Sequence, residues 1–151
     1  MKRLIYFILV CLWMITIFWF SSQNGDDSQA TSDVFTNRIV KFLNFSNEDV
    51  AKSAREILSF VVRKFAHFMI YFIGGFLIYG FINSFELSVK NVFYYSILIG
   101  FLYAALDELH QHFVPGRSAQ IRDIFIDTFG VFLMVGIRWL IDTLYRGKQK
   151  C

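Results

Sequence analysis

Four long apolar runs, separated by polar segments, set the pattern of this chain. The first covers about residues 4–20, and the others cover about residues 64–84, 90–107 and 123–141. A helix rises 1.5 Å per residue, so about 17–25 apolar residues cross the hydrocarbon core of a bilayer. The pattern therefore predicts an all-α integral membrane protein, with four transmembrane helices in a single domain that covers residues 1–151.

The segment 21–59, between the first two runs, is polar but contains two amphipathic stretches. Apolar residues recur near a 3.6-residue period within 34–43. Ser46 and Asp49 then have the spacing of a capping box, which would start a second helix that continues to about residue 61. We expect a partly helical loop that either lies on the bilayer surface or packs against the bundle.

Composition agrees with a membrane protein and excludes some functions. The 151 residues are 56% hydrophobic and 18% charged, whereas soluble domains average about 25% charged residues. The net charge of +3 forms no basic stripe interleaved with aromatics, so nucleic-acid binding is not supported. Cys11 lies inside an apolar run and Cys151 is the last residue, which implies no disulfide framework. No A-x-A site follows the first run, so we expect a retained helix rather than a cleaved signal peptide.

Charge asymmetry predicts the orientation. The segment 21–59 carries more acids than bases, whereas both ends of the chain are basic, and cytoplasmic flanks are usually rich in Lys and Arg. We therefore expect cytoplasmic N- and C-termini, with 21–59 and the 107–122 connector facing outward. The basic residues at the two ends are Lys2, Arg3, Arg146, Lys148 and Lys150.

That topology brings the start of the second run, the end of the third and the start of the fourth to the same outer side. An ionisable group at membrane depth costs about 2.5–3.5 kcal/mol on insertion scales, so these groups should face inward and pair across helices. Their spacing of three or four residues places them on shared helix faces. The predicted polar pocket contains Arg63, Lys64, His67, Tyr71, Asp107, Glu108, Gln111, Arg117, Asp123 and Asp127.

Arg117 follows a chain break at Pro115 and Gly116. A guanidinium near the membrane interface suits bidentate contact with a phosphate or a carboxylate, such as a lipid head group. The alternative is a structural ion pair between Arg117 and an aspartate at the same end of the bundle. The candidates for that pair are Asp107, Asp123 and Asp127.

Metal binding and catalysis have weaker signals. His110 and His112 resemble a ligand pair, but on a helix they point about 200° apart, so we expect no metal site and no cofactor. His67 would act as a proton shuttle or simply pack between helices. Candidates for acid–base chemistry are His67, Asp107, Glu108, Asp123 and Asp127.

Three segments together resemble the VanZ-like family of small bacterial membrane proteins. They are FSSQNGDDS at 20–28, RKFAHFMIYF at 63–72 and ALDELHQHFVPGRSAQIRDIFIDTFG at 105–130. The resemblance implies a bacterial cell membrane, a role at the cell envelope and a link to teicoplanin resistance. It also implies that His110 joins the predicted pocket residues as one of the family's polar positions, whereas His112 falls on a variable one.

We expect the protein to bind an anionic lipid head group or a lipid-linked cell-wall precursor at the outer leaflet. Arg63, Lys64 and Arg117 would hold the anion. The acids would orient these bases, while His67, Tyr71 and Gln111 would complete the hydrogen bonds. One alternative is a membrane-embedded hydrolase or transferase that acts on a lipid-linked phosphate. Another is a structural partner protein whose polar cluster only specifies helix packing.

Overall fold

The computed structural model describes residues 1–43, 47–117 and 119–148. These residues form five helices and no strand, which confirms the all-α prediction. The helices are α1 Lys2–Ser21, α2 Gly25–Leu43, α3 Glu48–Asn83, α4 Val89–His112 and α5 Ile121–Lys148. Four of them, α1, α3, α4 and α5, are long and apolar enough to cross a membrane.

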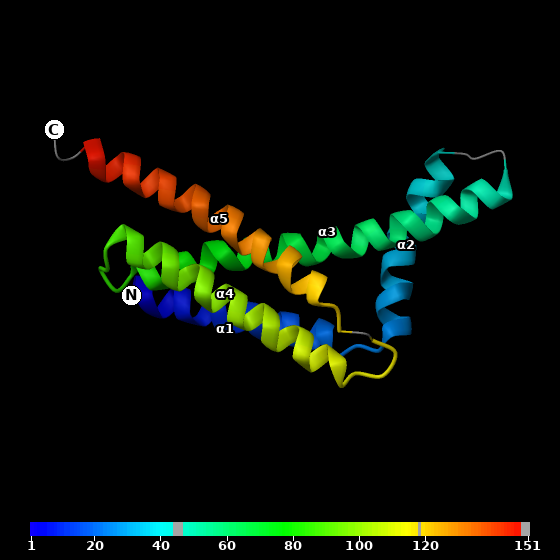
Figure 1. Cartoon of the computed structure of the whole chain (residues 1–151), viewed down its shortest axis with the longest axis horizontal. Helices are drawn as coiled ribbons and strands as arrows, with labels where there is room; N and C mark the ends of the chain where they lie inside the picture. Colours follow the sequence, from blue (N-terminus) through cyan, green and yellow to red (C-terminus); the bar gives the residue numbers. More distant parts are fainter. Residues whose placement is uncertain (44–46, 118, 149–151) are drawn as a thin grey trace.

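Helix α3 differs most from the prediction. The stretch expected as a separate helix ending near residue 61 and the run 64–84 form one helix of 36 residues. No Gly or Pro occurs between its start and Gly74, so nothing interrupts its backbone hydrogen bonds. At 1.5 Å per residue it is about 54 Å long, well beyond the roughly 30 Å of a hydrocarbon core. Its first half extends past the other long helices (Figure 1).

The start of α3 is capped one residue later than the sequence pattern predicts. The side chain of Asn47 accepts hydrogen bonds from the backbone N–H groups of Asp49 and Val50. Ser46, the predicted cap, lies outside the described residues. Glu48 and Asp49 add negative charge to the first turn, where the helix dipole favours it.

Helix α2 packs against the extended first half of α3 (Figure 1). Thr36 and Val40 are buried, and the hydroxyl of Ser59 donates to a carboxylate oxygen of Asp33 at 3.1 Å. The segment after α1 is therefore a helical hairpin arm in contact with the rest of the protein. A position of this arm on the bilayer surface stays a prediction.

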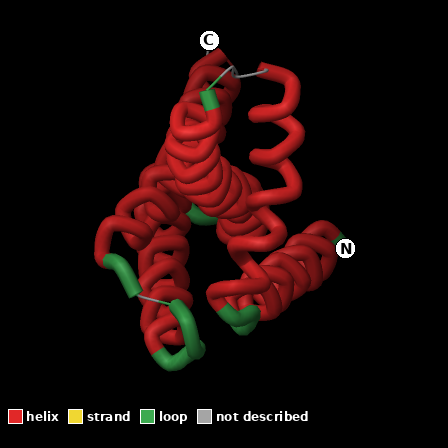
Figure 2. The backbone as a smooth tube through the Cα atoms, turned by 90° about the vertical axis from the view of Figure 1, so that its right-hand side faces the viewer, coloured by secondary structure: helices red, strands yellow, loops and turns green. Residues whose placement is uncertain are grey.

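Helix α3 is central because it packs against each of the other helices. The first residue and the end of α5 lie at one end of the bundle, together with the turn between α3 and α4 (Figure 1). The α1–α2 and α4–α5 connections lie at the opposite end. Figure 2 shows that the helix carrying the N-terminus stands apart from the helix carrying the C-terminus.

Glycines bring α3 and α5 into backbone contact. A Cβ on Gly75 would lie 2.9 Å from the carbonyl oxygen of Val131, and a Cβ on Gly130 would lie 2.5 Å from that of Phe68. On another face of α3, Gly74 leaves room for the indole ring of Trp13 in α1. Small residues permit such close approach in membrane helices. The two helices run parallel, so residues 64–75 of α3 lie along residues 123–131 of α5.

Candidate functional site

Two pairs of ionisable side chains join α3 to α5 at the end of the bundle away from the termini. The ammonium of Lys64 lies 2.5 Å from both carboxylate oxygens of Asp123. One turn further along both helices, Nδ1 of His67 lies 3.5 Å from Oδ2 of Asp127, whose side chain is fully buried. The three- and four-residue spacings seen in the sequence thus place matching partners opposite each other.

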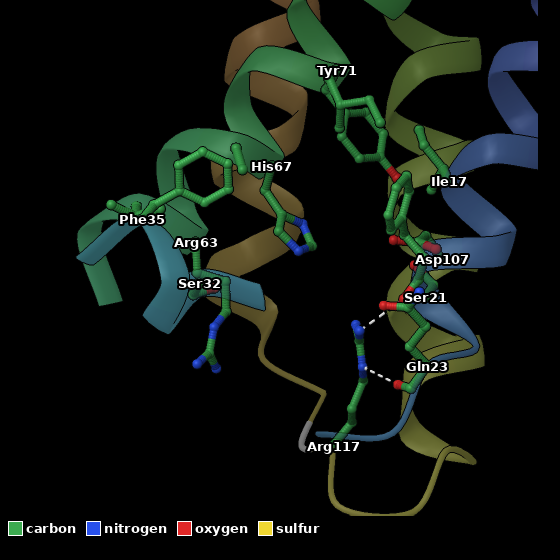
Figure 3. A pocket seen from close by; sticks show the side chains of 14 residues that line it. Ile17, Ser21, Gln23, Ser32, Phe35, Arg63, His67, Tyr71, Asp107 and Arg117 are labelled. Carbon is green, nitrogen blue, oxygen red and sulfur yellow. Dashed lines mark hydrogen bonds between the residues drawn. The ribbon is translucent and has the colours of Figure 1, made fainter. Parts of the chain in front are cut away.

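A third set of contacts ties α4 to α1. The side-chain amide of Gln111 donates to Oδ2 of Asp107 at 2.9 Å and to the hydroxyl of Ser21 at 3.2 Å. All three side chains are buried. The ring of Tyr71, from α3, points toward Asp107 (Figure 3). The end of α1, the end of α4 and the middle of α3 therefore meet in one polar region.

Arg117 lies in the turn between α4 and α5 and reaches into this region (Figure 3). Its Nε donates to the carbonyl oxygen of Gln23, and one terminal nitrogen donates to that of Phe20, both at 2.8 Å. Burial lowers the pKa of Arg117; the carboxylate of Asp107 raises it and the charge of Arg63 lowers it. A guanidinium still stays protonated at neutral pH. Within the described part of the chain no carboxylate pairs with Arg117, so the predicted alternative of an Arg–Asp pair is wrong.

These groups surround a cavity of about 250 Å³ between α1, α2, α3 and α4 (Figure 3). Its charged and titratable wall consists of Arg63, His67, Tyr71, Asp107 and Arg117. Nε of Arg63 is buried and has no hydrogen-bond partner among the described residues. The remaining wall is mostly apolar. Its apolar side chains are Ile17, Phe20, Phe35, Val62, Ala66 and Ile70.

Six of the predicted site residues do not line this cavity: Lys64, Glu108, His110, Gln111, Asp123 and Asp127. Lys64 pairs with Asp123, one of the acids expected to orient the bases, and its role as an anion ligand stays a prediction. One carboxylate oxygen of Glu108 accepts the backbone N–H of Gln120 at 2.8 Å and so ties α4 to the α4–α5 connection; its expected role of orienting a base stays a prediction. His110 instead stacks on an aromatic ring of α1. The partners of His110 are Phe18, with ring centroids 4.4 Å apart, and Ser22, whose hydroxyl lies 3.1 Å from Nε2.

Metal ligation finds no geometric support in residues 1–43, 47–117 and 119–148. No group of three or more His, Cys, Asp or Glu side chains there could hold an ion. His110 faces α1, and His112 is exposed at the end of α4. The two histidines thus point to different surroundings, as their spacing on a helix requires.

Several cavity residues have no counterpart among the predicted site residues. Ser21 and Gln23 belong to the segment 20–28, whose polar residues already carried the family resemblance, so a signal for them existed. Ser32 and Phe35 come from α2. No residue pattern indicated these two as cavity residues, because periodicity does not specify which part of the bundle α2 contacts.

Comparison with known proteins adds one match. A family model described as VanZ/LLP1 matches residues 6–142. No curated protein and no solved structure matches the chain. The matched range includes every residue that lines the cavity.

Proposed function

The chain belongs to the VanZ/LLP1 family, and from that premise we propose that this membrane protein binds an anionic lipid head group or a lipid-linked envelope precursor in the cavity beside α3. One observation carries the proposal. Two guanidiniums from distant parts of the chain, Arg63 and Arg117, line the same cavity, and neither has a carboxylate partner among the described residues. Paired positive charges at membrane depth are costly unless an anion neutralises them.

The rest of the wall suggests which part of the ligand enters. Arginine forks match the oxygens of a phosphate, and the apolar side chains of α1, α2 and α3 suit the first methylenes of a lipid. Asp107 offers an acceptor for a hydroxyl or amino group on the same head group. The cavity is smaller than the roughly 300–1,000 Å³ of typical small-molecule sites. It therefore fits a head group, while the acyl chains would leave between the helices.

The predicted orientation of the chain determines which leaflet the cavity faces. With cytoplasmic termini, the cavity lies toward the outer leaflet, because the end of α1 and the α4–α5 turn that line it are at the opposite end of the bundle from the first residue (Figure 1). The basic residues at both ends of the chain support that orientation. A lipid-linked cell-wall precursor presents its phosphates at that surface, so it is a ligand of the right charge in the right place.

Arg63→Gln is the substitution that tests this function. Since Nε of Arg63 has no partner to lose, the fold should persist. Loss of a charge-assisted contact should weaken binding of phosphatidylglycerol about 10-fold or more, measured by native mass spectrometry of protein released from nanodiscs. Arg55→Gln, on the exposed surface of the same helix, is the matched control. Equal retention of phosphatidylglycerol by the wild type and Arg63→Gln would refute the proposal.

The family resemblance extends the proposal to antibiotic resistance. A protein that occupies lipid-linked wall precursors would reduce their capture by glycopeptides at the cell surface. Expression of the wild-type chain in a susceptible bacterium should then raise the teicoplanin concentration needed to stop growth. Arg63→Gln, at equal membrane abundance, should not.

A second candidate is hydrolysis or group transfer on a lipid-linked phosphate. It is favoured by His67, which lines the cavity and lies within 3.5 Å of the buried carboxylate of Asp127. A histidine oriented in this way can accept a proton from an attacking water or hydroxyl group, and general-base catalysis contributes about 10²–10⁴-fold. Asp127→Asn should then abolish turnover of a lipid-linked pyrophosphate while its binding persists. Absence of any turnover by the wild type leaves the binding function alone.

A further inference from the structure

A second arginine environment lies at the other end of the bundle, far from the cavity described above. Arg138 belongs to α5, within the stretch Ile121–Tyr145 that is apolar enough to cross the membrane. Its guanidinium lies 5.0 Å from the ring centre of Phe76 and 5.4 Å from that of Tyr79. Its Nε is buried and has no hydrogen-bond partner among the described residues.

The acid nearest to Arg138 in sequence does not neutralise it. Asp142, one turn later, accepts the hydroxyl of Tyr79 at 2.9 Å and the amide of Asn83 at 3.5 Å. No described carboxylate lies within ion-pair distance of the Arg138 guanidinium. A charge inside a membrane-spanning helix normally faces a partner or a solvated cavity.

Such a cavity exists beside Arg138. It measures about 1130 Å³ and lies between the beginning of α1, the end of α3 and the turn that follows α3. Lys2, Arg3 and Arg138 supply positive charge to its wall, and Glu86 is the acid in that wall. The beginning of α1 and the α3–α4 turn, which line this cavity, lie at the opposite end of the bundle from the end of α1 and the α4–α5 turn, which line the Arg63–Arg117 cavity (Figure 1).

Arg3, another basic residue of this wall, is held in place by two contacts. A terminal nitrogen of Arg3 donates to the carbonyl oxygen of Ser84 at 3.0 Å, and the guanidinium lies 4.3 Å from the ring centre of Phe85. No second hydrogen bond joins the Arg3 guanidinium to a described residue. Apolar side chains of α1 and α3 complete the wall, including Phe7 and Phe81, whose ring centres are 5.8 Å apart.

We propose that this cavity, with Arg138 and Arg3 as its anchors, binds the phosphate group of an anionic phospholipid from the leaflet on the side of the termini. Positive groups recognise the phosphate, and the aromatic and aliphatic wall accommodates the start of the acyl chains. A zwitterionic lipid presents the same phosphate with a compensating cation, so it would bind more weakly. The protein would then hold one anionic head group at each membrane surface, at two independent sites.

The test uses the full chain in nanodiscs that contain a photoactivatable phosphatidylglycerol analogue. In the wild type, light should attach this lipid to peptides that contain residues 1–7 and 80–86. Arg138→Gln should reduce this labelling about 10-fold or more, whereas Arg138→Lys should retain part of it. Arg3→Gln gives a second measurement if Arg138→Gln does not fold.

Two controls separate this site from the first one and from free phosphate. Arg63→Gln should leave labelling of 1–7 and 80–86 unchanged, so the proposal survives even if the Arg63–Arg117 site binds nothing. Phosphatidylcholine analogues should label the peptides weakly, and inorganic phosphate should not displace the anionic lipid. Unchanged labelling in both Arg138→Gln and Arg3→Gln overturns the proposal, as does equal labelling by phosphatidylcholine.

Discussion

Individual residues in this protein divide into charges that neutralise each other and charges that do not. Lys64 and Asp123 form a close pair between α3 and α5 with little exposure to solvent. Arg63, the neighbour of Lys64, points to another face of α3 and lines a cavity without a carboxylate partner in the described chain. The two adjacent basic residues therefore differ: Lys64 joins two helices, and Arg63 is the residue that we propose holds the anion.

The pair makes a prediction about stability. Lys64→Met should lower the free energy of unfolding by about 3–5 kcal/mol, because it leaves the Asp123 carboxylate without its partner. Lys64→Met combined with Asp123→Leu should recover most of that loss, since a well-packed apolar pair replaces a buried ion pair at little cost. Thermal or denaturant unfolding in detergent measures both. If the double variant is as unstable as the single one, the pair is not the contact that matters.

The apolar pattern of the sequence predicted the long helices correctly but not the full length of α3 or the contacts of α2. The four apolar runs predict the four long helices, because twenty or so apolar residues permit few other structures. The length of α3 was not predicted. The charges of Arg63 and Lys64 suggested that a membrane helix starts there, whereas the helix continues through both residues. The contact between α2 and the cavity was also missed. It depends on which face of α3 receives Ser32 and Phe35, and local periodicity does not contain that information.

The contacts within the site could also be predicted only in part from the sequence. The pairing of His67 with Asp127 was not predicted, because it depends on how α3 and α5 run side by side. Spacing alone placed Lys64 and His67 on one helix face and Asp123 and Asp127 on another. It could not reveal that Arg117 would donate to backbone carbonyls of Phe20 and Gln23. Main-chain acceptors exist at every position, so no residue pattern marks the ones that a side chain will use.

Close packing of α3 against α5 leads to a matched pair of substitutions. A Cβ at Gly130 would lie 2.5 Å from the carbonyl oxygen of Phe68, whereas a Cβ at Gly136 would meet no atom within 4 Å. Gly130→Ala should therefore destabilise the protein by about 1–3 kcal/mol, because it forces the two helices apart. Gly136→Ala should be neutral or stabilising by up to about 1 kcal/mol, from helix propensity. Similar unfolding temperatures for the two variants would contradict the packing described for α3 and α5.

The whole molecule has two ends with different character. One end holds the first residue, Arg3 and Arg138 around one cavity; the other holds Arg63 and Arg117 around the second. An even number of spanning helices returns the end of α5 to the side of the first residue (Figure 1). The two cavities are therefore expected to face opposite leaflets.

Orientation of the whole chain can be measured with single cysteines in a background from which Cys11 and Cys151 have been removed. A cysteine at exposed Asn37 in α2 should react with a membrane-impermeant maleimide added outside intact cells. A cysteine at Lys2 should react only after the membrane is permeabilised, because basic flanks favour the cytoplasm. The reverse labelling would assign the Arg63–Arg117 cavity to the inner leaflet and would exclude contact with precursors at the outer surface.

Whether Arg63 and Arg117 together hold an anionic head group can be seen in an experimental structure of the protein in nanodiscs that contain an anionic phospholipid. We expect head-group density within hydrogen-bond distance of the guanidiniums of both Arg63 and Arg117. Arg63 paired with a carboxylate of the protein, with no lipid density in a well-ordered cavity, would contradict it.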